Sequence, residues 1–418
     1  MKRFELVTDA AAASTDGEVV VWPRAASGSE SLRTNVDCFL SRLGPVAGGA
    51  IDLVRLAAAA LIADRRAPRR AGWSRTIEMR VHVTSLASWG TAIEPAADLL
   101  AFLTGDDWRL ELMADASDRS EAASEAQPVE RIVLFSGGLD SFAGALLALN
   151  RDTKVAFLSQ RDNPIVAGSQ DRTWEWLSQH VTDELVGERV LLGHGRSLLE
   201  RSSRSRSMLF MALGVAVASA RGASTLEIPE NGFTSFNPPL GLDRAGTLST
   251  RSTHPHTIQL MNEIVGRLGV PVTVENPYEW ITKGELVHQA DETSNHEIDS
   301  GVAETLSCGK LDGRWYPGGN SHLNCGLCVN CIIRRGSIRA SGLSDETVYL
   351  VDMLGPTART ELIHARRGDL QAIRELVVKG ITVDELIASA PYPLGYDLDR
   401  AAEVCGRAIE EAASIDIP

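Results

Sequence analysis

Short runs of hydrophobic residues alternate with longer, helix-like stretches over the central part of the chain. Runs at residues 131–135, 155–158, 189–192, 225–228 and 270–274 are typical of buried strands, and helical segments separate them. Strands that alternate with helices in this way predict a right-handed, doubly wound, mostly parallel α/β sheet. Ligands of such sheets bind at the carboxyl ends of the strands.

The first 113 residues have a different pattern. Residues 19–22 and 108–112 predict short strands, and residues 51–63 predict an alanine-rich helix. Between them, apolar and polar positions alternate over residues 77–83, as in a half-buried strand. We therefore predict an N-terminal α+β accessory domain over residues 1–113.

The remaining boundaries follow from composition. Residues 114–130 are rich in Ala, Ser, Asp and Glu, which predicts a linker. Residues 131–343 hold the alternating strands and helices, and residues 344–418 form a polar, helical C-terminal extension.

A glycine-rich loop follows the first of the buried strands. Ser136, Gly137, Gly138, Asp140 and Ser141 belong to the sequence SGGLDS, and a helix is predicted directly after it. Glycines allow main-chain amides to approach phosphate oxygens, the hydroxyl groups add donors, and the helix N-terminus favours an anion. A carboxylate beside a polyphosphate is repulsive unless it holds Mg²⁺ or accepts a hydrogen bond from the loop. The alternative interpretation is a plain N-cap and turn.

Composition narrows the possible functions. The chain has 418 residues and a formal charge of −14, with a pI near 5.2, which argues against a large nonspecific nucleic-acid surface. A local basic patch could still bind RNA. The N-terminus has no apolar segment of signal-peptide length, and the most apolar helix carries charges. We expect a soluble, cytoplasmic protein that does not contact a membrane.

Four of the six cysteines form a pattern that indicates a metal site. Cys325, Cys328 and Cys331 have CxxCxxC spacing, and Cys308 lies seventeen residues before the first of them. Four thiolates suit a closed, structural Zn²⁺ site. An iron–sulfur cluster and ordinary buried thiols are the alternatives. Cys38 and Cys405 have no partner evident from spacing, and we interpret them as core thiols.

Together, the SGGLDS loop and the late cysteines resemble 7-cyano-7-deazaguanine synthase, QueC, of the PP-loop ATP pyrophosphatase superfamily. The resemblance covers about residues 131–340. It includes residues 206–210, similar to an RNxxF helix start, and residues 282–285, similar to an SKxE segment. It implies a PP-loop, HUP-like fold, ATP and Mg²⁺ at the loop, zinc at the cysteines, ATP contact by Arg206 and a catalytic role for Lys283. Independently, a lysine at a predicted helix start suggests a bound anion.

Five further residues are candidates for contact with the substrate. Glu230, Asn231 and Phe233 follow a predicted strand that ends near the loop, where Phe233 could stack on a base. A plain turn explains them equally well. Arg251 and His254 are candidates for substrate contact or helix capping rather than metal binding, because the histidines here are spaced too irregularly for a metal pair.

The chain departs from an ordinary QueC in its additional N-terminal and C-terminal segments. In this respect it resembles the QueC-like proteins of bacterial antiphage systems, especially the Qat component QatC. That resemblance implies an AMP-forming, ATP-dependent ligase that adenylates a 7-deazaguanine carboxylate and joins it to the N-terminus of a partner protein from the same defence operon. Residues 1–113 would dock this partner, so their deletion should spare activation.

The alternatives are QueC-type nitrile synthesis with ammonia, tRNA thiolation, and a non-enzymatic, nucleotide-gated defence scaffold. The acidic charge and the cysteines fully used as metal ligands disfavour thiolation.

Overall fold

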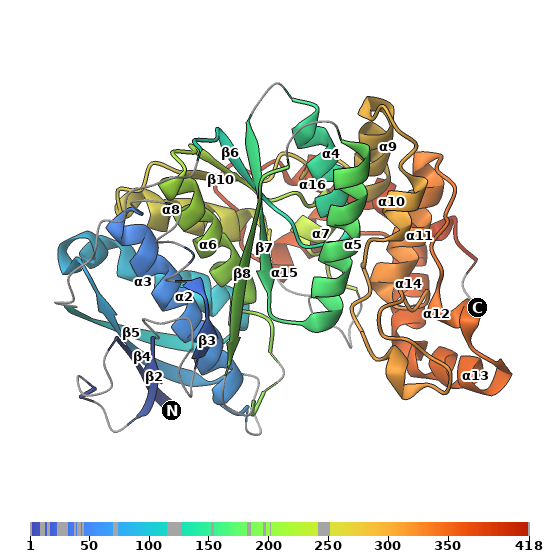
Figure 1. Ribbon diagram of the computed structural model, residues 1–418. Helices are drawn as coiled ribbons and strands as arrows, with labels where there is room; N and C mark the ends of the chain where they lie inside the picture. The colour runs from blue at the N-terminus through green and yellow to red at the C-terminus, as the bar shows by residue number, and fades with distance from the viewer. Residues whose placement is uncertain are drawn as a thin grey trace.

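The computed structural model places helices and strands along most of the chain (Figure 1). The described residues are 2–8, 13–14, 17–22, 32–36, 39, 43, 46–69, 74–114, 127–151, 154–181, 185–194, 198–200, 202–240 and 251–416. The predicted linker lies largely outside them, and Cys38 lies outside them entirely.

The central sheet has the order β10-β9-β6-β7-β8-β3 among the described strands. These strands are β3 (Leu32–Thr34), β6 (Arg131–Leu134), β7 (Val155–Arg161), β8 (Gly187–His194), β9 (Thr225–Glu227) and β10 (Thr273–Glu275). The pairs among β6 to β10 are parallel, and β3 adds antiparallel to β8 at the edge. The predicted doubly wound α/β sheet is confirmed.

Helices cover both faces of this sheet (Figure 1). One face carries α4 (Leu139–Leu149) and α5 (Pro164–His180), and the other carries α6 (Arg206–Ala220) and α8 (Pro255–Arg267). Val133 and Ile132, neighbours on β6, belong to different buried clusters because successive side chains of a strand point to opposite faces. This explains the uninterrupted apolar run in the sequence.

The strand order reverses between β6 and β9. From β6 the chain winds outward through β7 and β8, then returns to place β9 on the other side of β6. A parallel sheet has a crevice at such a point, outside the carboxyl ends of the two strands. The SGGLDS loop follows β6 and Glu230 follows β9, so this topology brings the two predicted site segments together.

A second sheet lies in the N-terminal segment, with the order β2-β1-β4-β5. Its strands are β1 (Lys2–Val7), β2 (Glu18–Val21), β4 (Thr76–Val83) and β5 (Asp107–Ala114), and its helices are α2 (Gly48–Arg66) and α3 (Leu86–Thr104). All three described pairings are parallel. The segment thus combines helices and strands, with α2 and α3 before and after β4 in the chain. Its boundary at residue 113 stays a prediction.

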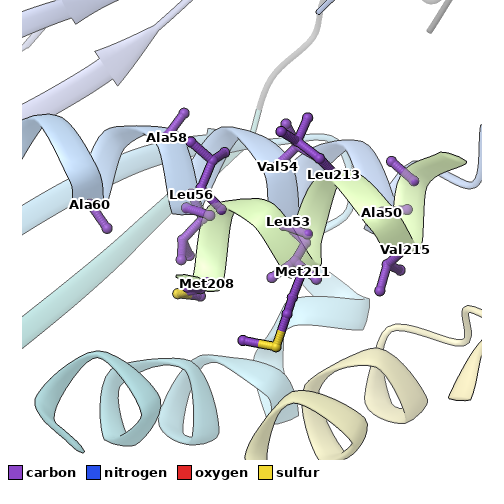
Figure 2. Close-up of a cluster of buried hydrophobic side chains, with 14 of the residues drawn as sticks. Ala50, Leu53, Val54, Leu56, Ala58, Ala60, Met208, Met211, Leu213 and Val215 are labelled. Carbon is purple, nitrogen blue, oxygen red and sulfur yellow. The ribbon is translucent and has the colours of Figure 1, made fainter. Parts of the chain in front are cut away.

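The two sheets share one hydrophobic core. Helix α2 packs along α6, where Leu53, Leu56, Met208 and Met211 lie in one buried cluster (Figure 2). Helix α3 packs on α8 in the same way, and β3 belongs to the central sheet. Because this packing crosses residue 113, deletion of residues 1–113 would expose α6 and α8 to water. The deletion is therefore a poor test of partner docking.

The C-terminal extension is helical, as predicted for residues 344–418, and contains α12 (Leu350–Met353), α13 (Pro356–Ala365), α14 (Arg367–Lys379), α15 (Val383–Ser389) and α16 (Leu398–Ala413). Before it come α9 (Lys283–Thr293), α10 (Asp299–Ala303), the 3-10 turn η3 (Gly313–Trp315) and α11 (Val329–Ser341). The short helix α7 (Gly232–Phe236) lies between β9 and α8 in the chain. Residues from α7, α11, α14 and α16 share a second buried cluster. Within the described ranges, no helix has the length and apolar character needed to cross a membrane.

Candidate active site

The SGGLDS loop makes a tight turn between β6 and α4. Gly137 has a φ of +78°, and a Cβ there would lie 2.8 Å from the backbone nitrogen of Gln170, so only glycine fits without strain. Its carbonyl accepts hydrogen bonds from the Ser169 hydroxyl at 2.7 Å and the Leu306 amide at 3.0 Å. The loop is thus held from two sides, and its serines face each other, with Ser136 Oγ 3.1 Å from Ser141 Oγ.

Asp140 lies in the first turn of α4 and is buried between two donors. Lys283 Nζ lies 2.6 Å from Asp140 Oδ1, and the side-chain amide of Asn231 donates to Asp140 Oδ2 at 2.8 Å. Lys283 is the first residue of α9, after the N-cap Thr282, and Asn231 is the N-cap of α7. Three helix starts therefore meet at one carboxylate.

The pKa values of the two carboxyl groups at this point shift in opposite directions. Burial opposes ionisation of Asp140, but the Lys283 ammonium and the hydrogen bonds from its neighbours hold the pKa of Asp140 below its ordinary value. Burial and the negative charge of Asp140 raise the pKa of Glu230 well above its usual range. Of the two groups, Asp140 is therefore the one that the site favours in its ionised form.

A cavity of about 190 Å³ opens beside these groups. Its lining comes from the loop, from the segment after β9, from the start of α9 and from the cysteine-rich region: Ser136, Gly138, Leu139, Asp140, Ser141, Pro229, Glu230, Thr234, Lys283, Ser307, Asn330 and Ile333. The structure thus gathers Ser136, Asp140, Ser141, Glu230 and Lys283 around one space. That these residues act in catalysis or binding stays a prediction.

The four predicted metal ligands form a buried cluster. The Sγ atoms of Cys308, Cys325, Cys328 and Cys331 all lie within 4.8 Å of one another. The separations are 4.0 Å between Cys308 and Cys328 and 3.8 Å between Cys325 and Cys331. Tetrahedral Zn²⁺ with four thiolates at ~2.3 Å places its sulfurs about 3.8 Å apart. The cluster could therefore bind one zinc ion, whereas several irons with bridging sulfides need wider spacing.

The thiolate cluster is connected directly to the loop. Asn324 accepts hydrogen bonds from the amides of Ser307 and Cys308 at 2.9 and 3.1 Å and donates to the Thr305 carbonyl at 3.0 Å. The same segment supplies the Leu306 amide that bonds to Gly137. A metal at the thiolates would therefore fix one wall of the cavity and one anchor of the loop.

Two of the predicted ligand-binding residues lie away from the cavity lining. Arg206 begins α6 and forms an ion pair with Asp162, which directly follows β7, with Nε 3.4 Å from Oδ2. Phe233 is 1% exposed and packs in the C-terminal hydrophobic cluster. The predicted stacking of Phe233 on a base is therefore corrected, because its ring faces the core, while the next residue, Thr234, lines the cavity.

Arg251 and His254 contact other parts of the protein and do not line the cavity beside the loop. Arg251 donates to the carbonyls of Phe102 and Ser389, both at 3.1 Å, and so joins the end of α3 to the end of α15. His254 is the N-cap of α8, where its ring accepts from the His256 amide, and burial lowers its pKa to about 3. Substrate contact by these two residues stays a prediction, and the alternative of helix capping holds for His254.

Three cavity residues with polar side chains were absent from the sequence prediction. Ser307 precedes the first predicted zinc thiol and Asn330 lies inside the CxxCxxC segment, so the local sequence connects both with the metal site and not with the loop. Thr234 follows Phe233, and the side of α7 that faces the cavity could not be determined from five residues. The proximity of the cysteine cluster to the loop was the missing information.

Replacement of Gly137 by alanine tests whether this turn is required. We expect a fall in ATP turnover of at least about 10-fold, because the added Cβ conflicts with the Gln170 backbone and with the positive φ. Gly90→Ala in α3 is the matched control, since nothing lies within 4 Å of a Cβ there. Steady-state pyrophosphate release measures both variants. Equal activity of Gly137→Ala and the wild type would contradict the assigned role of the loop.

Comparisons with known proteins identify relatives for about half of the chain. No protein-family model matches it. It is similar to 7-cyano-7-deazaguanine synthase 1 of Sphingopyxis alaskensis, with 24% identity over 242 residues that cover 52% of this chain and 97% of that protein. It is 25% identical over 249 residues to the 7-cyano-7-deazaguanine synthase of Syntrophobacter fumaroxidans, covering 53% and 96% of the two chains. The corresponding synthase of a Synechococcus species is 25% identical over 240 residues, covering 51% and 96%. These similarities support a QueC-like family for the chain.

Proposed function

We propose that this protein uses ATP to activate a 7-deazaguanine carboxylate as its acyl-adenylate, with release of pyrophosphate. The observation that carries the proposal is the glycine loop with the buried Asp140–Lys283 pair at the switch point of a parallel sheet. Relatives named 7-cyano-7-deazaguanine synthase supply the substrate class.

In the first step, a carboxylate oxygen of the substrate attacks the α-phosphorus of ATP, and the bond to the pyrophosphate oxygen breaks. The free N–H groups at the start of α4 and the hydroxyls of Ser136 and Ser141 would bind the departing pyrophosphate. Lys283 would supply a positive charge within reach of the same oxygens. No side chain needs to act as the nucleophile.

Asp140 and Glu230 are the residues that would hold Mg²⁺ in this scheme. Both line the cavity, and carboxylate oxygens are the ligands that this ion prefers. Burial and the charge of Asp140 raise the pKa of Glu230, and a bound cation would lower it again because it favours the ionised carboxylate. The bound ion supplies charge stabilisation to the departing phosphate oxygens.

In the second step, we propose that the N-terminal amine of a partner protein attacks the acyl carbon. The amide bond forms, AMP leaves, and the amine loses its proton to solvent or to a basic group of the site. The enzyme would then be an AMP-forming ligase, acting in the cytoplasm as part of an antiphage defence operon. The resemblance to QueC-like defence proteins supports this choice, as does the half of the chain that lies outside each aligned region.

The second candidate is synthesis of 7-cyano-7-deazaguanine itself. The printed names of the relatives favour it, because each is called a synthase of that nitrile. The first activation is the same, with ammonia in place of the protein amine. The primary amide that ammonia forms must then lose its oxygen in a second ATP-dependent activation to become the nitrile. The two candidates therefore separate at the product.

The decisive test combines the enzyme with ATP, Mg²⁺, a 7-deazaguanine carboxylate and the co-expressed operon proteins, with or without ammonium. Conjugation predicts that intact-mass spectrometry finds one partner heavier by the acid minus one water, only when ATP is present. Unchanged partner masses together with free nitrile in the ammonium sample would contradict conjugation and support the second candidate. The Lys283→Ala variant is the control for uncatalysed addition.

A further inference from the structure

The last helix of the described chain, α16, packs against the elements that carry the candidate active site. It contacts α7, α9 and α11. Asn231 is the N-cap of α7, Lys283 begins α9, and Cys328 is the N-cap of α11, which contains Cys331. Figure 1 shows α16 beside α7 and behind α4. Apolar packing alone would hold α16 against the C-terminal cluster. Its additional polar contacts with residues around the site therefore suggest a further role for this helix.

Glu411 of α16 accepts hydrogen bonds from three donors on two other helices. The hydroxyl of Thr282 donates to Oε1, while the Gly284 amide and the Ser337 hydroxyl donate to Oε2 at 3.2 and 2.7 Å. Thr282 and Gly284 are the residues on either side of Lys283. The Glu411 carboxylate thus holds both neighbours of the lysine that contacts Asp140.

The packing at this point leaves no room for rearrangement. A Cβ on Gly284 would lie 2.5 Å from the Glu411 carboxylate, and a Cβ on Gly336 would lie 2.4 Å from the Glu411 carbonyl oxygen. Glycine at these two positions allows α16 to approach α9 and α11 closely. Burial raises the pKa of Glu411, although the hydrogen bonds from Thr282, Ser337 and Gly284 oppose that shift.

Other contacts of the same helix hold the segment before α9. Arg407 pairs with Glu285, with Nε 2.7 Å from Oε1, and also donates to the Trp280 carbonyl. Glu285 in turn accepts from the Thr282 amide at 2.9 Å, which completes the capping box of α9. The start of α9 is therefore fixed by its own cap and by α16 together.

From these contacts we infer that Glu411 is a positioning residue for Lys283, and that the C-terminal helix completes the active site by fixing the first turn of α9. Its effect on rate rests on the proposed function. The ammonium of Lys283 must reach Asp140 and the phosphate oxygens, and a displacement of about 1 Å at a catalytic group can lower a rate ~100-fold. Loss of the Glu411 carboxylate frees both backbone neighbours of that group.

The kinetic test compares Glu411→Ala, Glu411→Gln and the exposed neighbour Glu410→Ala. We expect Glu411→Ala to lower kcat for pyrophosphate release about 10- to 100-fold with a smaller change in the KM for ATP. Glutamine keeps an acceptor for Gly284 and Ser337 and can donate to Thr282, so Glu411→Gln should recover most of the rate. Glu410→Ala should match the wild type, because Glu410 is exposed on the same helix.

A double-mutant cycle separates positioning from general damage. In single-turnover assays, Glu411→Ala should change the rate less than about 2-fold when Lys283 is already alanine, because the group that it positions is gone. An equal loss in both backgrounds would overturn the inference and assign Glu411 a purely structural role.

Hydrogen exchange gives a readout that does not depend on catalysis. Glu411→Ala should accelerate amide exchange at residues 284–286 relative to the wild type and Glu410→Ala, since the Gly284 amide loses its acceptor. Unchanged exchange there would overturn the inference even in a fully active enzyme. If the wild type releases no pyrophosphate, the proposed function fails, and the exchange result still decides whether Glu411 fixes the start of α9.

Discussion

Replacement of Asp140 by asparagine is expected to lower the rate of pyrophosphate release by at least ~100-fold. The substitution keeps the size of the side chain but removes the charge that pairs with Lys283 and that would hold Mg²⁺. In the native protein the Asn231 amide donates to Asp140 Oδ2. The NH₂ group of the new asparagine cannot accept this hydrogen bond, so the substitution also disturbs that contact. The effect should fall on catalysis, which single-turnover assays with radiolabelled ATP measure directly.

The fold of Asp140→Asn should survive, because Glu230 lies beside Lys283 and can ionise once the neighbouring negative charge is gone. Circular dichroism and thermal unfolding check this point. Asp171→Asn is the matched control, since Asp171 is an exposed carboxylate on α5. Wild-type turnover by Asp140→Asn would contradict the assignment of the buried pair to the active site.

Replacement of Cys328 by serine should remove the metal and destabilise the C-terminal half of the protein. Structural Zn²⁺ bound by four thiolates contributes on the order of 10 kcal/mol in small metal domains. Here the thiols anchor the segment around Ser307 and begin α11, so their separation would also release the loop at Gly137. We expect less than one zinc per chain, a lower unfolding temperature and reduced ATP turnover.

Cys405→Ala is the control for a lost buried thiol, because Cys405 is fully buried in α16 but lies outside the thiolate cluster. It should retain one zinc per chain. Elemental analysis of the wild type decides the identity of the metal. Absence of zinc, or the brown absorption of an iron–sulfur cluster, would contradict the site as assigned.

Local sequence patterns predicted the parts of this molecule that depend on a few neighbouring residues. The SGGLDS loop needs glycine at a positive φ and a helix directly after it, and both requirements appear within ten residues. Likewise, three of the four predicted metal ligands lie within the seven consecutive residues from Cys325 to Cys331. The five parallel strands of the central sheet followed from periodicity, since each is a short apolar run, but the edge strand β3 from the N-terminal segment did not.

Contacts between distant segments could not be predicted in the same way. Phe233 and Thr234 are adjacent, and only the packing of α16 on α7 decides that the first faces the core and the second the cavity. Arg251 reaches carbonyls contributed by α3 and α15, which no local pattern connects. The shared core of α2 and α6 is of the same kind, because the apolar residues of each helix do not say which other helix covers them (Figure 2).

We propose that this site cleaves ATP between the α- and β-phosphates when a 7-deazaguanine carboxylate is present. The most direct measurement is ³¹P NMR of wild-type enzyme incubated with ATP, Mg²⁺ and the acid, with Lys283→Ala as the slow reference. We expect AMP or an acyl-adenylate together with pyrophosphate, formed only with the acid and much faster by the wild type than by Lys283→Ala. Formation of ADP and phosphate, or unchanged ATP in every sample, would contradict it.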